Sequence, residues 1–284
     1  MKNNVKLLEA MMSDSLNQSN LYKPGNFWHQ AAVVSAKKMK EDGILNFRGR
    51  SGLIGQGFTD NICEDPTIIW EVGKYKRFLK KIADIPLFRK IFLKNFMDRI
   101  EKNYKKNNLY EDYFLEHKYG EWFKEIQKNF NLPDTMVGGL EKESTVLIGD
   151  YRISKFYLEN IGRIQTFSKQ CDLSKVKTVF EIGGGFGANA HLLLNFYPNI
   201  KKYIYLDVAP MLYIGTEYLK HFYPNAVKDY LTTRKHESIG FKANDDLEIL
   251  CITPWQIEQL EGEVDLFWNA SSFQEIPMNS VKNY

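Results

Sequence analysis

Cysteine is scarce in this sequence, and the few cysteines lie far apart. Three occur among 284 residues, Cys63, Cys171 and Cys251, and no two have the C-x-x-C spacing of a zinc or redox pair. This distribution argues against a disulfide framework and against a zinc site. It suits a reducing compartment, so we expect a cytoplasmic protein.

Long apolar runs and a strong charge imbalance are also missing. No apolar stretch approaches the length that spans a membrane. The first twenty residues contain Glu9 and Asp14 and no sustained apolar core, so they do not read as a signal peptide. The net charge of +3 is too small to indicate a nucleic-acid partner by itself. With 44% hydrophobic and 26% charged residues, the composition fits a soluble globular protein.

One local charge excess occurs in the N-terminal half. Residues 74–106 carry twelve Lys or Arg residues against three acidic residues. We interpret them as the solvated face of amphipathic helices. The alternative is a patch that meets an anionic glycan, a nucleotide-sugar or the inner membrane surface.

A glycine-rich stretch in the same half resembles a phosphate-binding loop. Gly52, Gly55 and Gly57 follow Arg48 and Arg50. No clear strand precedes them, so the context of a P-loop is absent. A plain surface loop is the favoured interpretation.

The chain divides into two parts of different character. Residues 1–145 are predicted to form a mostly helical N-terminal domain, and residues 146–284 a second domain. The segment "LPDTMVGG" (132–139) contains Pro and two glycines, which indicates a linker. A helix is predicted to begin near Asp150, a fair N-cap, and to run through "YRISKFYLENIGRIQTF".

In the second part, predicted strands alternate with predicted helices. Helical patterns follow the first two strands, at "ANAHLLLNFY" and "MLYIGTEYLKHFY". This alternation predicts an α/β fold with parallel βαβ units, whose ligands bind beyond the carboxyl ends of the strands. The four predicted strands are residues 177–182, 202–208, 247–252 and 264–270.

The stretch "VFEIGGGFGANAH" (179–191) joins the first strand to the first helix. Four glycines fall within five positions, at 183, 184, 185 and 187. A glycine loop between a strand and a helix lets the backbone approach a ligand, and the start of the helix offers free N–H groups. Binding a cofactor is therefore favoured over a glycine-rich turn that binds nothing.

Two cofactor classes match this loop. The dinucleotide pattern G-x-G-x-x-[GA] is met by Gly183, Gly185 and Ala188, and the pattern E-x-G-x-G-x-G begins at Glu181. Both patterns expect an acidic residue at the end of the next strand to accept the ribose hydroxyls, and Asp207 lies there. An acid two residues before the first glycine favours the second pattern, because its carboxylate suits a positively charged ligand.

On these residues the sequence resembles the class I S-adenosylmethionine-dependent methyltransferases. Within 145–284 it is more narrowly similar to the sugar O-methyltransferases encoded with bacterial surface-polysaccharide genes. The segments that carry this similarity are "YRISKFYLENI", "FEIGGGFGANAHLLL", "YLDVAPMLYIGTEYL" and "FWNASSFQEIP". In the N-terminal part only "EDPTIIWEVGKYKRFL" contributes.

The resemblance implies a Rossmann-like sheet that binds S-adenosylmethionine and transfers its methyl group to a hydroxyl of a sugar, nucleotide-sugar or glycan. No nucleic-acid partner is expected, because the fourth strand reads "NASSF" and lacks the Pro-Pro of base methylases. Two alternatives remain open: an NAD(P)-dependent oxidoreductase with the same loop, and a cofactor-binding protein without chemistry. The residues expected to bind the cofactor are Glu181, Gly183, Gly185, Gly187, Asp207 and Asn269.

Two residues are candidates for the base that removes the hydroxyl proton. Glu275 follows the fourth strand, where we expect it in an extended loop ahead of Pro277; a plain loop acid is the alternative. His191 lies one turn into the helix after the glycine loop, where a structural histidine is favoured. No acid or histidine cluster has metal spacing, so no metal is expected. Trp255 and Gln256 are weak candidates for contacts with adenine, and Asn269 is equally well explained as a strand-end cap.

The chain ends at Tyr284, soon after the fourth predicted strand. The class I sheet has seven strands, so we expect either that the sequence is truncated or that the N-terminal helices cover the fourth strand, "VDLFWNA". Without such cover this strand would be a bare apolar edge, which natural proteins avoid. Truncation is the favoured expectation.

Overall fold

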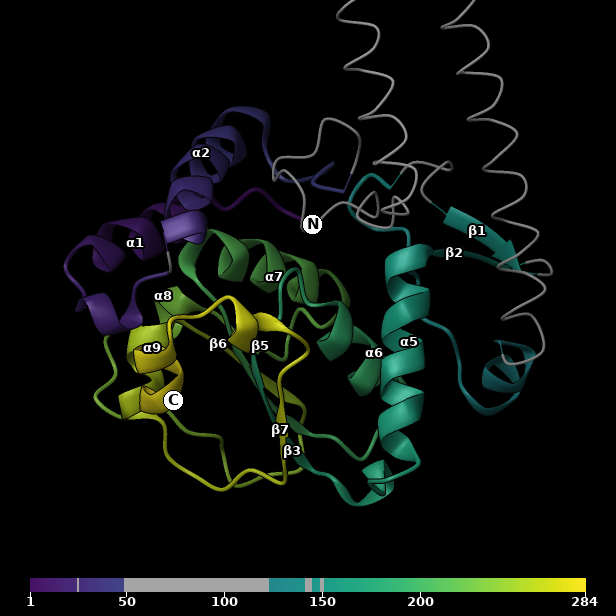
Figure 1. Ribbon diagram of the computed structural model, residues 1–284. Coiled ribbons are helices and arrows are strands. Elements are labelled where there is room, and N and C mark those ends of the chain that lie inside the picture. The colour runs from purple at the N-terminus through teal and green to yellow at the C-terminus, as the bar shows by residue number, and fades with distance from the viewer. Residues whose placement is uncertain (25, 49–122, 141–144, 149–150) are drawn as a thin grey trace, which may run out of the picture.

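The computed structural model describes residues 1–24, 26–48, 123–140, 145–148 and 151–284, and within these it has an α/β architecture (Figure 1). A five-stranded parallel sheet forms its centre, in the order β5-β6-β4-β3-β7. The strands are β3 (Thr178–Ile182), β4 (Lys202–Leu206), β5 (Val227–Lys228), β6 (Glu248–Ile252) and β7 (Leu266–Trp268).

The four predicted strands are confirmed, and with them the α/β class of the fold. They correspond to β3, β4, β6 and β7, although β7 is shorter than predicted. The two-residue strand β5 was not predicted, because it is too short to show a period in the sequence. It pairs with β6, so β6 is not the edge of the sheet.

Side chains alternate across the sheet and give it two unequal apolar faces. Tyr203 and Tyr205 of β4 join the larger cluster, which extends into α5 (Lys155–Ser168), α6 (Ala188–Phe196) and α7 (Ala209–Phe222). Ile204 and Leu206 point to the opposite face and join a smaller cluster. That cluster is covered by loops and by the 3-10 helix η5 (Pro254–Gln259). The helical layer therefore covers one face much more thickly than the other.

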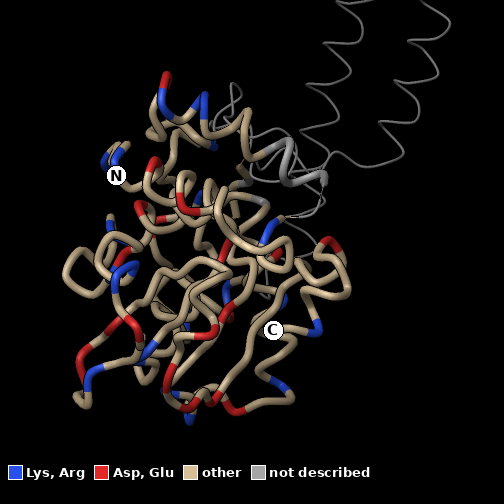
Figure 2. Tube along the Cα trace, turned by 90° about the vertical axis from the view of Figure 1, so that its left-hand side faces the viewer, with Lys and Arg blue, Asp and Glu red and all other residues tan. Residues whose placement is uncertain are grey.

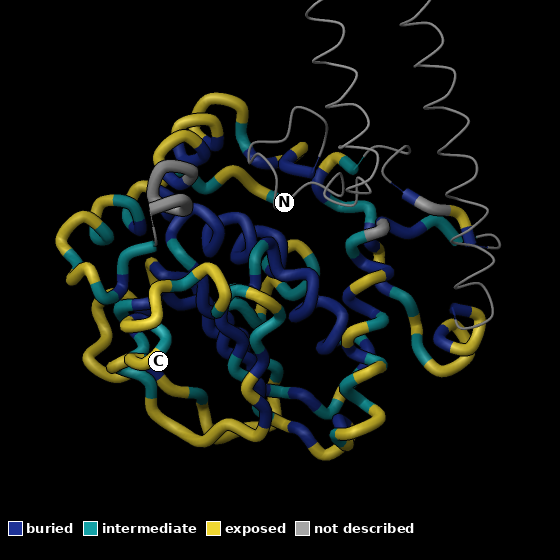
Figure 3. The backbone as a smooth tube through the Cα atoms, viewed as in Figure 1, coloured by how far each residue is buried: buried dark blue, intermediate teal, exposed yellow. Residues whose placement is uncertain are grey.

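The N-terminal helices pack on the outside of this helical layer. Helix α1 (Val5–Leu16) contacts α7 and α8 (Tyr230–Thr233), and α2 (Asn26–Asp42) contacts α7 (Figure 1). Leu7, Leu8 and Met11 are fully buried in the same apolar cluster as the sheet. Figure 3 shows the result: α7 and the central strands are buried, and α1 and α2 present exposed residues outward.

The prediction that a helix begins near Asp150 is wrong. Tyr151–Ser154 forms strand β2, which pairs antiparallel with β1 (Thr145–Ile148), and α5 begins at Lys155. The Ser154 side chain accepts a hydrogen bond from Tyr157 N at 3.1 Å, so Ser154 is the N-cap. Residues 151–154 pair with β1 instead of continuing the helix, so the helix begins after Ser154.

The predicted loop at 132–139 is held by a buried arginine. The Arg48 guanidinium, only 1% exposed, donates to Thr135 O at 2.6 Å and to Val137 O at 3.0 Å. It also lies over the rings of Tyr157 and Phe186. Arg48 is therefore a core residue, not part of a phosphate loop. Gly52, Gly55 and Gly57, and the basic stretch 74–106, lie outside the described residues.

Strand β7 lies at one edge of the sheet. Its described pairing is with β3 alone, and Phe267, 48% exposed, faces the thinly covered side. Helices α1 and α2 make their main contacts with α7 and α8. Among the described residues, the N-terminal helices therefore do not provide the cover considered above.

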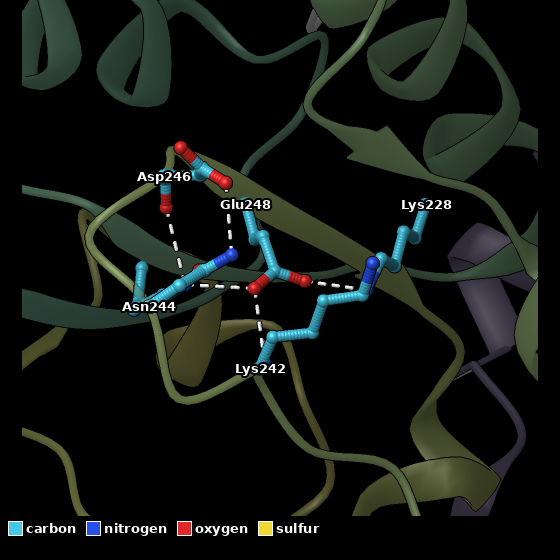
Figure 4. Close-up of polar contacts among 6 residues, drawn as sticks. Lys228, Lys242, Asn244, Asp246 and Glu248 are labelled. Carbon is cyan, nitrogen blue, oxygen red and sulfur yellow. Dashed lines mark hydrogen bonds and ion pairs between the residues drawn. The ribbon is translucent and has the colours of Figure 1, made fainter.

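A cluster of charged residues closes the amino ends of β4 and β6 (Figure 4). The Glu248 carboxylate accepts from Lys202 Nζ at 2.7 Å, from Lys242 N at 3.0 Å and from Lys228 Nζ. These bonds outweigh the desolvation of the carboxylate and lower the Glu248 pKa to about 2. The cluster joins β4, β5 and β6 at the end of the sheet opposite the glycine loop.

Candidate functional site

A pocket of about 440 Å³ opens at the carboxyl ends of β3, β4 and β7. Its floor is the glycine loop together with Leu206–Val208, and one side is the segment 270–277 after β7. The segment 22–24, which begins at the last residue of the 3-10 helix η1 (Asn20–Tyr22), and one face of α5 also line it. The carboxyl ends of parallel strands all lie at the same edge of the sheet. The loops that follow these strands therefore meet here, although they are far apart in the sequence.

The glycine loop fits closely against the protein's own side chains. A Cβ on Gly183 would overlap Ser272, and a Cβ on Gly184 would overlap the ring of Tyr205. These two glycines are therefore required by the packing of β4 and of the segment after β7. Both still line the pocket, so they lie between it and the packed side chains.

Gly185 and Gly187 are required by backbone conformation. Their φ angles are 64° and 95°, in the left-handed region that side chains disfavour. Gly187 is the N-cap of α6, and it does not line the pocket. Gly185 does, and its N–H donates to Asp207 Oδ2 at 2.7 Å.

Asp207 joins the end of β4 to the glycine loop. Its carboxylate, 8% exposed, accepts from Gly185 N and from Val208 N at 2.6 Å. Burial outweighs these bonds and raises the Asp207 pKa to about 7. The nearby Glu181 and Glu275 carboxylates contribute to this rise in the pKa. Each carboxylate oxygen accepts more than one hydrogen bond, so Asp207 has capacity for a ligand's hydroxyls.

Glu181 lies beneath the loop, 1% exposed, and does not line the pocket. It accepts from Tyr203 OH at 2.9 Å and from Asn189 Nδ2 at 3.2 Å. Burial outweighs both bonds and raises the Glu181 pKa to about 7. Asn189 does line the pocket, so Glu181 reaches the site through this side chain.

Asn269 organises the turn after β7. Its amide donates to Ile182 O at 2.9 Å and to Ser272 Oγ at 2.6 Å, which ties the end of β7 to the end of β3. Asn269 does not line the pocket, whereas its neighbours Ala270, Ser271 and Ser272 do. Asn269 therefore has the geometry of a strand-end cap, which was the alternative to cofactor binding in the sequence analysis.

Glu275 lines the pocket, on the side formed by the segment after β7. The segment is not the extended loop that we predicted: it forms a 3-10 helix, η6 (Ser272–Gln274), with Glu275 as its C-cap. Its N–H donates to Ser272 O at 2.9 Å. The exposed Glu275 side chain is close enough to Asp207 to raise the pKa of that carboxyl.

His191 lies outside the pocket, in the core between α5, α6 and α7. Its Nδ1 is 2.8 Å from Tyr157 OH, and its ring stacks on Phe222 with centroids 3.8 Å apart. Burial lowers the His191 pKa to about 3. This geometry is that of a structural histidine, and we give His191 no part in the function proposed below.

The residues after β6 are divided between pocket and core. Pro254 lines the pocket, but Gln256 is 2% exposed and bonded to Thr233 and Thr253. Trp255 donates to Tyr230 OH at 3.3 Å and lines a neighbouring apolar pocket of about 100 Å³. Of the residues after β6, Pro254 therefore lines the main pocket, whereas Trp255 and Gln256, the two candidates for contacts with adenine, do not.

Two walls of the pocket were not predicted from the sequence. One is the segment Tyr22–Pro24, which is brought to the site by the packing of α1 on α7 and by contacts of η1 with the C-terminal helix α9 (Met278–Asn283). The other is the face of α5 that carries Phe156, Asn160 and Arg163. Their spacing of four and three residues places them on one side of a helix, and this was the available signal.

The described part of the chain contains no group of three metal-ligating side chains, and none of its helices is long and apolar enough to cross a membrane. Acidic and basic residues are interspersed along it (Figure 2). No protein-family model, no curated protein and no solved structure matches this chain.

Proposed function

We propose that the protein is an S-adenosylmethionine-dependent O-methyltransferase that acts in the cytoplasm on a hydroxyl of a sugar or glycan of surface-polysaccharide synthesis. The observation that carries this proposal is the pair of buried carboxylates, Glu181 and Asp207, at the glycine loop. The sheet order β6-β4-β3-β7 suits a class I methyltransferase and a dinucleotide-binding protein equally.

The charge of the site separates these two ligand classes. Buried carboxylates with raised pKa values favour a ligand that brings positive charge, because the ligand restores the charged form. S-adenosylmethionine carries a sulfonium and an ammonium group. A dinucleotide instead brings a pyrophosphate to the glycine loop, where the buried Glu181 opposes it, whereas Asp207 suits the ribose of either ligand.

Several of the residues that line the pocket have a role in the proposal. Asp207 accepts hydrogen bonds from the ribose hydroxyls of the cofactor. The loop Gly183–Gly185 lies against the chain of the cofactor. The bound cofactor supplies an electrophilic methyl group. The segment 270–277 orients the acceptor hydroxyl, and Glu275 removes its proton.

Calorimetry with S-adenosylhomocysteine and with NAD⁺ tests the cofactor assignment. We expect binding of the first and none of the second by the full chain. Gly185→Val should abolish binding in a folded protein, because a β-branched side chain is strained at φ 64°. Gly240→Val, at an exposed glycine outside the pocket, is the control. Binding of NAD⁺ alone would instead identify an oxidoreductase, and unchanged affinity in Gly185→Val would contradict the loop's role.

A further inference from the structure

The wall of the pocket formed by α5 contains a buried hydrogen-bond donor for which the described residues provide no acceptor. Asn160 is fully buried, and its Nδ2 has no hydrogen-bond partner in the part of the chain that the structure describes. Its Oδ1 accepts from Arg163 Nη1 at 3.1 Å, which fixes the orientation of the amide. A buried N–H without a partner is costly, so native proteins keep few of them.

Arg163 brings positive charge to the same wall. It lines the pocket, and its side chain is 47% exposed. Its ion pair with Glu159 is long, at 3.9 Å, and a guanidinium has five N–H donors. Asn160 and Arg163 together offer donors to two oxygens of one carboxylate, the arrangement that suits planar anions.

Helix α6 offers a hydrogen-bond acceptor to the pocket, in contrast to the donors on α5. Asn189 lines the pocket, its Nδ2 donates to Glu181, and its buried Oδ1 has no partner among the described residues. The buried Glu181 behind it adds negative charge. This side of the pocket therefore suits a positively charged donor, such as an ammonium group.

We propose that Asn160 and Arg163 bind the carboxylate, and Asn189 the ammonium group, of an α-amino-acid end of the ligand. The proposal rests on the proposed function, because S-adenosylmethionine has such an end. It deepens that function by assigning the amino-acid end to α5 and α6, whereas Asp207 binds the ribose. A dinucleotide has no α-amino-acid group to fill this subsite.

A comparison of two nucleosides separates the contribution of the amino-acid end to binding affinity from that of the adenosine end. S-adenosylhomocysteine has the amino-acid end, whereas 5′-methylthioadenosine shares the adenosine and the thioether but lacks that end. We expect the full chain to bind the first at least about tenfold more tightly by calorimetry. Arg163→Met and Asn160→Leu should each remove most of this preference and leave the affinity for 5′-methylthioadenosine within about twofold.

The control is Lys175→Met. Lys175 is an exposed residue outside the pocket, and its substitution removes one positive charge just as Arg163→Met does. It should leave both affinities unchanged. Circular dichroism shows whether each variant is folded. Asn160→Leu has a second readout: the ligand-free variant should be at least as thermally stable as Arg163→Met, because leucine removes the unpartnered donor.

The outcomes separate failure of this inference from failure of the proposed function. If neither nucleoside binds the unmodified protein, the proposed function and this subsite both fail. If both bind equally well, or if Arg163→Met weakens both equally, the adenosine site stands and the assignment of α5 to the amino-acid end is overturned. Loss of the preference in Lys175→Met as well would show a general charge effect and would also overturn it.

Discussion

Asp207 is the residue on which the proposed cofactor site depends most directly. It is buried, it holds the glycine loop through Gly185 N, and it lines the pocket. Charge-assisted hydrogen bonds to two ribose hydroxyls would contribute about 1.5–3 kcal/mol each. We therefore expect Asp207→Ala to weaken S-adenosylhomocysteine binding at least about tenfold by calorimetry. Asp172→Ala, at an exposed acid outside the pocket, should bind normally, and equal affinity of the two variants would contradict the ribose assignment.

Glu275 is the residue that the proposed chemistry requires. As general base it would contribute about 10²–10⁴-fold to turnover, so Glu275→Gln should lose that factor while binding cofactor normally. The loss should shrink at high pH, where hydroxide replaces the base. Methyl transfer to candidate glycans across a pH series measures this, with Glu263→Gln, an exposed acid outside the pocket, as the control. Turnover within a few-fold of the unmodified protein at every pH would show that Glu275 is only a loop charge.

At the scale of elements, the charged cluster around Glu248 joins three strands. The Glu248 pKa is lowered from 4.5 to about 2, so the cluster's contribution to stability is fully present above pH 4.5. It is lost as the pH falls toward 2, because the protonated acid no longer pairs with Lys202 and Lys228. Glu248→Gln should therefore lower the melting temperature at pH 6, and the difference from the unmodified protein should shrink as the pH falls to 3.

Thermal melts followed by circular dichroism at several pH values measure this difference. Glu237→Gln, at an exposed residue in the loop after α8, is the control and should show little effect at any pH. A difference for Glu248→Gln that stays constant between pH 6 and pH 3 would show that it comes from packing rather than from the ion pairs.

At the scale of the whole molecule, α1 is held on the sheet domain by Asp14. Its carboxylate accepts from Tyr230 OH at 2.6 Å and pairs with Arg234 at 2.8 Å, and this pair is less exposed than the one between Glu9 and Lys40. We expect Asp14→Ala to lower the free energy of unfolding by about 1–3 kcal/mol, whereas Glu9→Ala should cost less than about 1 kcal/mol.

Urea unfolding of both variants measures these values. The comparison bears on how the molecule is held together, because the segment Tyr22–Pro24, which lines the pocket, follows α1 in the chain. Equal destabilisation by the two substitutions would indicate that the apolar contacts of Leu7, Leu8 and Met11, rather than Asp14, hold this helix in place.

The sequence by itself determined the features that depend on local chemistry. Apolar runs between turn signals predicted β3, β4, β6 and β7, and the glycines of 183–187 marked the loop at the end of β3. The tertiary structure decided what depends on contacts between distant residues: Ser154 rather than Asp150 begins α5 because residues 151–154 pair with β1. In the same way, Arg48 and His191 are buried, and Asn160, Arg163 and Tyr22 line the pocket. The physical reason is that a side chain's type and spacing follow from the sequence, whereas its neighbours follow from how the helices pack on the sheet.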